Sequence, residues 1–341
     1  MITPLVFVAA LSVTILSPVI HLVAAIFDLA FDRRRWRVSR LVGIGLAFCV
    51  AEVFGLFTMF TVWLGSGFGL FMDRPFWIRA NYLLTSQYIA LVTNAFAFFL
   101  GYKLTFTTDE LPDGPHILLP CHAGPGDSFR LQRLILRDLG RRCHSVGATK
   151  LQWDPFLDRA GSRLRFHFLH QNPEDTAAEL RRISDLAAGL GADETLLICP
   201  EGGDFTPKRR RARIDAMKKA GRTDRVRRAQ KLRYTLLPRT GGALAAMAGA
   251  PEATVVLMAH AGLGDIHDFA SLWNAIPLRR HVRVHAWAVS SDDRPTDRSA
   301  RAEWLLDHWE AVDEWIAHAL DQMPRLHSSD DRKTLGRRLD P

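Results

Sequence analysis

The sequence contains too few cysteines to build a disulfide framework. Four occur among 341 residues, at positions 49, 121, 143 and 199, whereas disulfide scaffolds are short and rich in cysteine. No two of them form a Cys-x-x-Cys pair. We therefore predict neither a four-thiolate zinc site nor a thioredoxin-type redox site, and we expect no metal site.

Charged residues are almost absent from three long stretches near the N-terminus. Met1–Phe31 contains only Asp28, Leu41–Met72 contains only Glu52, and Ala80–Tyr102 contains none. A bilayer core requires about 20 apolar residues as helix, and the first two stretches are longer. No basic segment and no small-residue cleavage site mark a signal peptide. We therefore predict a membrane anchor of two apolar helices over residues 1–72.

The third stretch differs because polar residues interrupt it. Ser86 and Thr93 are seven residues apart, as are Gln87 and Asn94, so these side chains share one helical face. This pattern favours an amphipathic helix that belongs to the soluble domain or lies at its membrane side. A third membrane span is the competing interpretation.

The loop between the first two stretches is strongly basic, which makes the topology ambiguous. Asp32–Arg40 contains five arginines, and short basic loops usually stay in the cytoplasm. If only two helices cross, this loop and the following domain lie on opposite sides. They share a side if the third stretch also crosses, or if the first two form a hairpin that enters from the cytoplasmic face.

After residue 102, short apolar runs alternate with amphipathic ones, which predicts an α/β domain with a mixed sheet flanked by helices. We expect this domain over residues 80–324 and a polar tail over 325–341. The predicted strands are Leu104–Thr107, Ile117–Cys121, His144–Ala148, Phe166–Leu169, Thr195–Cys199, Thr254–Met258 and Val282–Val289. The predicted helices are Ser128–Leu139, Thr176–Leu190, Arg209–Gln230, Gly242–Met247 and Glu303–Met323, with a capping box at Thr176 and Glu179.

Two segments carry residues suited to catalysis. His122 follows a predicted strand directly, and Asp127 lies five residues on, at the start of a predicted helix. Such a histidine can be a general base that a carboxylate orients, but on this pair alone a helix cap and a surface histidine are the favoured explanations. The second segment, Cys199–Gly203, places Glu201 and two glycines after another strand, where backbone N–H groups can approach a ligand.

Together these residues resemble the membrane-bound lysophospholipid acyltransferases, including the 1-acylglycerol-3-phosphate acyltransferases. His122 and Asp127 match the family's His-x4-Asp motif, and Pro200-Glu201-Gly202-Gly203 matches its Pro-Glu-Gly-Thr motif. Weaker matches are Lys150-Leu151-Gln152 and Leu236–Gly242, which resembles a Leu-Pro-Arg-Thr segment of larger members. The resemblance covers about residues 80–290.

The resemblance implies transfer of a fatty acyl group from acyl-CoA or acyl carrier protein to a lysophospholipid hydroxyl, foremost that of 1-acylglycerol-3-phosphate. His122 would be the base and Asp127 its partner, with no cofactor. The implied substrate-binding residues are Lys150, Arg163, Arg165, Glu201, Gly202, Gly203, Lys208 and Arg239. Both donors are cytosolic, so we expect the domain on the cytoplasmic face of the cell membrane.

The sequence departs from the family pattern at several positions. Cys121 replaces the usual Asn, Gly203 the usual Thr, and Asp204 an Arg that is frequent there. His170 and Gln171 follow the strand of the second motif, which normally ends in Arg, so that cation is absent or displaced to Arg163 or Arg165. The phosphate assignment is therefore weaker than the catalytic one.

The sequence also allows other interpretations. A Gly-Asp-Ser hydrolase needs an Asp-x-x-His after Ser128, and the sequence has that pattern only before it. The twelve basic residues of Lys208–Lys231 could suggest nucleic acid, but no aromatic residue interleaves them, and anionic lipid headgroups fit better. An acceptor other than lysophosphatidic acid and a catalytically degenerate membrane scaffold remain open.

Overall fold

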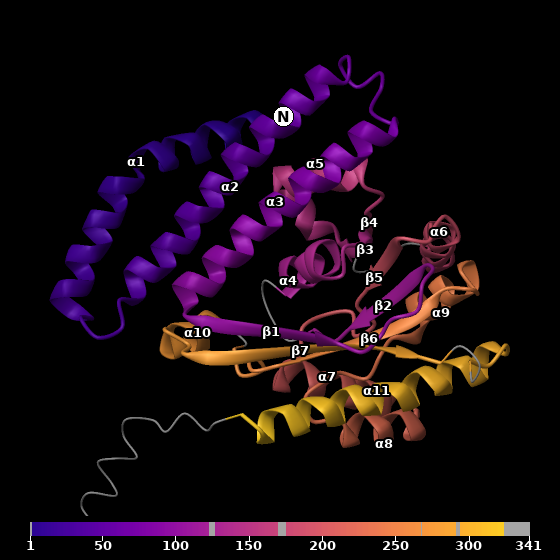
Figure 1. Cartoon of the computed structure of the whole chain (residues 1–341). Coiled ribbons are helices and arrows are strands. Elements are labelled where there is room, and N and C mark those ends of the chain that lie inside the picture. Colours follow the sequence, from indigo (N-terminus) through magenta and orange to yellow (C-terminus); the bar gives the residue numbers. More distant parts are fainter. Residues whose placement is uncertain (1, 123–126, 170–174, 267, 291–293, 324–341) are drawn as a thin grey trace, which may run out of the picture.

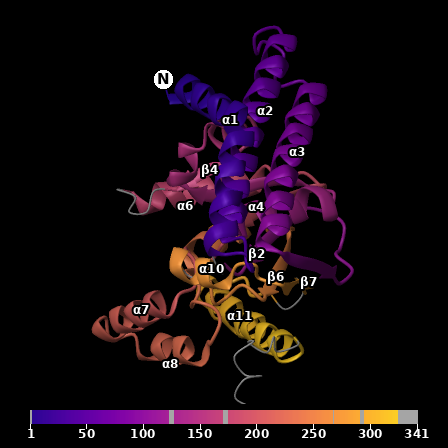
Figure 2. The same cartoon turned by 90° about the vertical axis from the view of Figure 1, so that its left-hand side faces the viewer.

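The computed structural model describes residues 2–122, 127–169, 175–266, 268–290 and 294–323. Three N-terminal helices, α1 (Ile2–Phe31), α2 (Arg37–Gly65) and α3 (Pro75–Leu100), are long and apolar enough to span a membrane. They run side by side and rise beyond one edge of the α/β domain (Figures 1 and 2). The stretch that was interrupted by polar residues is thus a third long helix.

The domain that follows is built on one mixed seven-stranded sheet of order β1-β7-β6-β2-β5-β3-β4. All neighbours are parallel except β6 and β7. The strands are β1 (Tyr102–Thr108), β2 (His116–Pro120), β3 (Arg142–Ala148), β4 (His167–Leu169), β5 (Glu194–Ile198), β6 (Thr254–Ala261) and β7 (Arg280–Val289). The predicted α/β fold and all seven predicted strands are confirmed.

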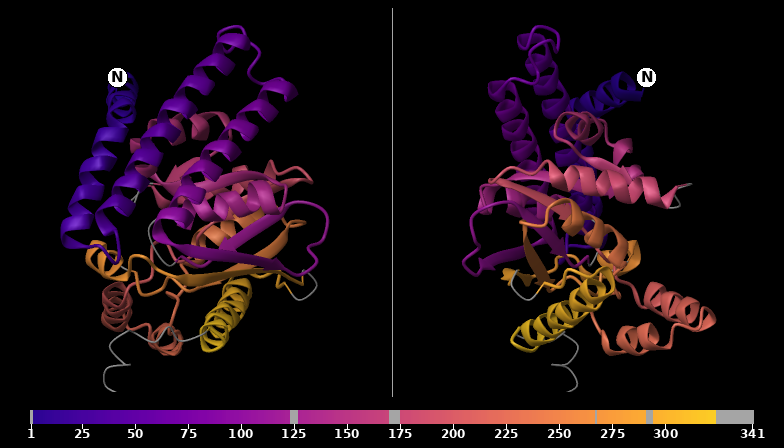
Figure 3. Two further views of the ribbon diagram at one scale, coloured as in Figure 1. Left: turned by 60° about the vertical axis from the view of Figure 1, so that its left-hand side comes forward. Right: turned by 90° about the vertical axis from the view of Figure 1, so that its right-hand side faces the viewer.

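Strict alternation along the central strands produces two apolar layers. Ile117 and Leu119 of β2 pack with α6 (Thr176–Ala188), α9 (Thr240–Gly249) and α11 (Arg298–Asp321). Leu118, between them, faces α4 (Asp127–Arg133) and the π-helical turn η1 (Leu134–Asp138). The sheet is therefore buried on both faces, as parallel sheets usually are, and Figure 3 shows it from two further sides.

Several predicted helices differ in detail. The helix expected over Arg209–Gln230 is divided into α7 (Pro207–Lys219) and α8 (Thr223–Lys231), because Gly221 adopts φ 68° between them. The capping box at Thr176 is wrong, since Asp175 is the N-cap and accepts the N–H of Ala178. Three helices were not predicted: η2 (Thr149–Trp153), α5 (Pro155–Arg163) and α10 (Phe269–Ala275).

The polar face of α3 lies against the soluble domain, although α3 is also long and apolar enough to span a membrane. Arg137 donates to Ser86 Oγ and Gln87 Oε1, at 3.1 and 2.9 Å. One turn earlier, Arg133 donates to the side chains of Thr93 and Asn94. The two pairs of polar residues seven apart therefore bind two arginines four apart on the neighbouring helix.

Helix α2 also approaches the domain closely, at Gly55. A Cβ added there would lie 2.5 Å from Cδ2 of Phe156, which starts α5 and is fully buried. The Phe156 ring stacks on Tyr88 of α3 at 3.9 Å. The Tyr88 hydroxyl contacts Glu52 Oε1 and Asp154 Oδ2 at 3.1 and 3.0 Å. The helices and the domain thus share one small core.

The basic loop between α1 and α2 contacts the domain through α10. Arg35 donates to the carbonyl of Asn274 at 2.9 Å, and the guanidinium of Arg37 lies 5.5 Å from the Trp273 ring centroid. Arg40 donates to the carbonyl of Phe99 at the end of α3. The basic loop and the entry to the domain therefore lie on the same side of the helices.

Candidate active site

The site forms where two parallel strands end side by side. β2 pairs with β5, so His122, two residues after β2, and the loop that follows β5 lie at the same edge of the sheet. The N–H of Phe205 donates to the carbonyl of His122 at 2.9 Å, which folds that loop back onto the histidine. Thr206 then caps α7 by accepting the N–H of Arg209.

Glu201 holds the two segments together. Its Oε1 accepts the backbone N–H of His122 and its Oε2 accepts that of Leu236, both at 3.0 Å. The side chain is fully buried, and burial raises its pKa to about 7 although both hydrogen bonds favour the ionised form. The structure places Glu201 as a positioning residue beneath His122, whereas the sequence motif suggested contact with substrate.

The His122 ring contacts a carboxylate that the sequence did not single out as its partner. Its Nε2 lies 2.9 Å from Oδ1 of Asp204, and both side chains are partly exposed. Asp127 begins α4, but its side chain, like residues 123–126 before it, lies outside the described residues. The His122–Asp127 contact therefore stays a prediction.

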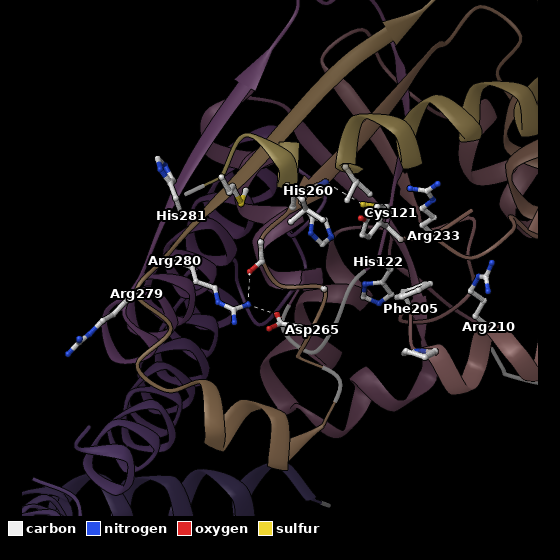
Figure 4. Close-up of a pocket in the computed structure, with 18 of the residues that line it drawn as sticks. Cys121, His122, Phe205, Arg210, Arg233, His260, Asp265, Arg279, Arg280 and His281 are labelled. Carbon is white, nitrogen blue, oxygen red and sulfur yellow. Dashed lines mark hydrogen bonds and ion pairs between the residues drawn. The ribbon is translucent and has the colours of Figure 1, made fainter. Parts of the chain in front are cut away.

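A cavity of about 880 Å³ opens in front of His122. Figure 4 shows the His122 ring beside Phe205, with His260 on the facing side. Apolar side chains of α11 form one wall. Five arginines line the cavity, at positions 210, 211, 233, 279 and 280. The site can therefore take a ligand with an apolar part and an anionic part, next to an imidazole.

Three predicted binding residues lie in other parts of the domain. Lys150 is in η2 and lines a separate pocket with Thr3 of α1. Arg163 donates to Asn81 Oδ1 and to the carbonyl of Met59, so it joins α5 to α2 and α3. Arg165, at φ 56°, donates to the carbonyl of Gly189. None of the three is among the described residues that line the His122 cavity.

The other predicted residues lie on or beside the loop after β5. Gly202 and Gly203 adopt φ 62° and 145°, a region that favours glycine. A Cβ on Gly202 would lie 3.3 Å from Cδ of Arg239, so Arg239 lies directly against this turn. Lys208 is exposed on α7. The Gly202 N–H is used within the turn, where it donates to the carbonyl of Cys199.

Sequence reasoning missed the cations at the far side of the cavity. Arg279 and Arg280 stand where β7 begins, and this end meets the carboxyl end of β6 because the two strands are antiparallel. Arg280 pairs with Asp265 of the preceding loop. The signal available was the run Leu278-Arg279-Arg280 before an alternating strand. Among the described residues, no group of three or more His, Cys, Asp or Glu could hold a metal ion.

Fold and site first define a class: an α/β enzyme domain with a histidine at a strand end, joined to helices that are apolar enough to span a membrane. A family model described as Acyltransferase matches residues 103–257, which include β2 to β5, most of β1, the first half of β6 and both motif segments. The chain is therefore an acyltransferase. No curated protein and no solved structure gives a significant match to it.

Proposed function

We propose that the enzyme transfers a fatty acyl group from a thioester, acyl-CoA or acyl carrier protein, to the free hydroxyl of a lysophospholipid. The observation that carries this proposal is the position of His122. It stands at the mouth of a cavity with an apolar wall and a cationic rim, and Glu201 fixes its backbone. A lysophospholipid has the matching parts: an acyl chain, a phosphate and a hydroxyl between them.

In this mechanism His122 accepts the proton of the acceptor hydroxyl while that oxygen attacks the thioester carbonyl. A C–O bond forms, and collapse of the tetrahedral intermediate breaks the C–S bond. The imidazolium then returns its proton to the departing thiolate. No protein nucleophile is required, because the acceptor is itself the nucleophile. If the acceptor hydroxyl donates its proton to Nε2 of His122, the contact between this nitrogen and Asp204 has to break first.

The acceptor phosphate is assigned to the cationic rim of this cavity. Arg279 and Arg280 approach from β7, while Arg211 and Arg233 approach from α7 and from the segment after α8. Arg280 is already paired with Asp265, so its charge is partly neutralised. A monoanionic or dianionic headgroup fits such a rim, and 1-acylglycerol-3-phosphate is the acceptor that we propose.

We further propose that α1 to α3 enter the membrane from the cytoplasmic face without crossing it completely. Large apolar side chains are exposed along all three helices. However, Arg163 of α5 reaches Asn81, near the start of α3, and Met59, near the end of α2. A complete crossing would draw this charged part of the domain into hydrocarbon, which is costly. The basic loop at the other end suits anionic headgroups.

The test is a reaction panel with purified protein. Lysophospholipids with different headgroups are combined with acyl-CoA and acyl carrier protein donors, and the products are identified by mass spectrometry. The proposal expects phosphatidic acid from 1-acylglycerol-3-phosphate, and expects the His122→Ala variant to lose it. Transfer to a neutral lysolipid alone would replace the acceptor, and release of free fatty acid in place of transfer would indicate a hydrolase.

A further inference from the structure

A second cavity lies beside the Gly202 turn, between α7, α8 and the segment 235–240. Its volume is about 440 Å³, which is within the range of small-molecule sites. Five arginines line it, at positions 210, 213, 222, 225 and 239. We call it the arginine pocket. Helices α7 and α8, which line it, lie on the side of the domain away from the N-terminal helices (Figure 2).

The charge of the arginine pocket is not balanced from within. None of the described residues that line it is acidic. Arg210 donates to the carbonyls of Ala229, Gln230 and Leu232, which ties α7 to the end of α8. Arg225 is paired with Glu303 of α11 at 2.8 Å. These contacts explain two of the five arginines.

Arg213 has the clearest need for an additional partner. Its Nη2 makes one long hydrogen bond, of 3.4 Å, to the carbonyl of Gly202. Its Nη1 is buried and has no hydrogen-bond acceptor within the described part of the chain. Burial, together with the like charge of Arg239, lowers the pKa of Arg213 to about 10. A half-buried cation of this kind is stabilised by an anion that enters the pocket.

The rest of the lining indicates what kind of anion fits. Ile214, Met217 and Leu237 form an apolar cluster beneath the arginines. A free inorganic ion would leave this surface exposed, whereas a phosphate attached to an organic group would cover it. Arginine suits phosphate in particular, because its planar guanidinium offers paired donors.

We propose that the arginine pocket is a second anion subsite, which binds a phosphate-bearing part of one of the two substrates. The shared chemistry is an organic phosphate. We expect its source to be the nucleotide phosphates of the CoA donor, because the acceptor phosphate is assigned to the cationic rim of the His122 cavity. Binding of the glycerol phosphate of the acceptor is the other outcome of the test, and it would replace that assignment. The choice of these two ligands rests on the proposed function, but the cavity and its charge do not. Arg213 and Arg239 both touch Gly202, so the bound anion lies against the loop that contacts His122 through Asp204.

Calorimetry with the full-length protein tests the subsite. Free CoA and glycerol 3-phosphate are titrated separately into wild type, into an Arg213→Gln/Arg222→Gln variant and into an Arg181→Gln/Arg227→Gln control. The control removes two exposed arginines that do not line the pocket. We expect the pocket variant to bind CoA about tenfold or more weakly, the loss expected for one charged hydrogen bond. The control should bind as wild type does.

The two ligand arms identify the source of the phosphate. Weaker binding of CoA alone assigns the donor, and weaker binding of glycerol 3-phosphate alone assigns the acceptor. Unchanged binding of both ligands by a folded variant overturns the subsite. If the double variant does not fold, Arg222→Gln alone is used, since this side chain is exposed.

Repeating the titrations with His122→Ala separates this proposal from the proposed function. Wild-type turnover by that variant would refute the catalytic role of His122, and the binding results would still decide the subsite. Conversely, unchanged binding of both ligands by a folded pocket variant that still transfers the acyl group would remove the subsite and leave the proposed reaction in place.

Discussion

Nε2 of His122 lies 2.9 Å from Oδ1 of Asp204, on the loop that follows β5. An imidazole has two nitrogens, and a catalytic base uses one for the substrate and the other for an orienting partner. Asp204 therefore occupies a position that either the acceptor hydroxyl or the orienting carboxylate must hold. Which of the two applies is decided by comparing Asp204 with Asp127.

We expect Asp204 to be dispensable and Asp127 to be required. His122→Ala and Asp127→Ala should each lower kcat by about 10²–10⁴-fold, the usual contribution of general-base catalysis. Asp204→Ala should leave kcat within about threefold of wild type, because it frees Nε2 for the hydroxyl. Steady-state kinetics with one lysophospholipid and one acyl-CoA measures this. A loss at Asp204 as large as that at His122 would make Asp204 the orienting carboxylate.

Glu201 should make the stability of the protein depend on pH. Burial raises its pKa from 4.5 to about 7 in the folded state. Below pH 4.5 the side chain is protonated in both the folded and the unfolded state, so it adds no pH dependence there. As the pH rises towards 7 the unfolded chain ionises first, and the folded state loses up to about 3 kcal/mol relative to it.

Glu201→Gln removes this titration and supplies the comparison. Thermal unfolding is followed for both proteins between pH 4.5 and 8. The wild type should lose stability relative to the Gln variant as the pH rises, and the difference should become constant above about pH 8. Parallel curves across the whole range would mean that the carboxyl group does not titrate in this window.

Gly55 should tolerate no side chain, in contrast to Gly45 ten residues earlier on the same helix. Gly55→Ala would place a methyl group 2.5 Å from the fully buried ring of Phe156, and overpacking typically destabilises a protein by about 1–3 kcal/mol. At Gly45 an added Cβ meets nothing within 4 Å. Gly45→Ala should therefore be neutral or stabilising. Equal melting temperatures for the two variants in detergent would contradict the close contact of α2 with α5.

Cysteine labelling in intact cells tests the membrane placement. Single cysteines are introduced at Arg34 in the basic loop, at Leu70 between α2 and α3, and at Asp321 at the end of α11. All three positions should resist a membrane-impermeant thiol reagent, with the parent chain labelled in parallel to account for its four cysteines. Labelling at position 70 alone would show that the helices cross. Labelling at position 321 would place the domain outside.

Features of the fold could be predicted from the sequence where they depend on neighbouring residues alone. The strand at Ile117–Cys121 was predicted because a short apolar run is a property of neighbouring residues, and the structure shows that this strand is buried on both faces. The polar residues at 86, 87, 93 and 94 likewise predicted one polar face of α3, but that this face binds Arg133 and Arg137 of the domain is seen only in the structure. Gly221 separates α7 from α8, but the sequence predicted one continuous helix because basic residues continue on both sides of this glycine.

The cationic side of the site could not be predicted, because it depends on the crossover from β6 through α10 to β7. Arg279 and Arg280 are more than 150 residues from His122 in the sequence, and only the antiparallel pairing brings the start of β7 to the catalytic edge. Arg163 shows the reverse case. It was assigned to phosphate by resemblance, yet it joins α5 to the N-terminal helices. The spacing of residues in the sequence therefore identifies motif residues at the end of one strand. It does not identify the residues from distant segments that the fold brings next to them.

On the proposed placement in the membrane, the contact of the basic loop with α10 sets the height of His122 above the lipid surface. Arg35 and Arg37 connect that loop to Asn274 and Trp273, five to seven residues before the arginines of the cavity. The hydroxyl of a lysolipid can then reach His122 while its acyl chain stays among the chains of the neighbouring lipids. On the proposed placement, the rate should follow the mole fraction of lysolipid in the surface, and adding inert lipid at constant total lysolipid should slow the enzyme.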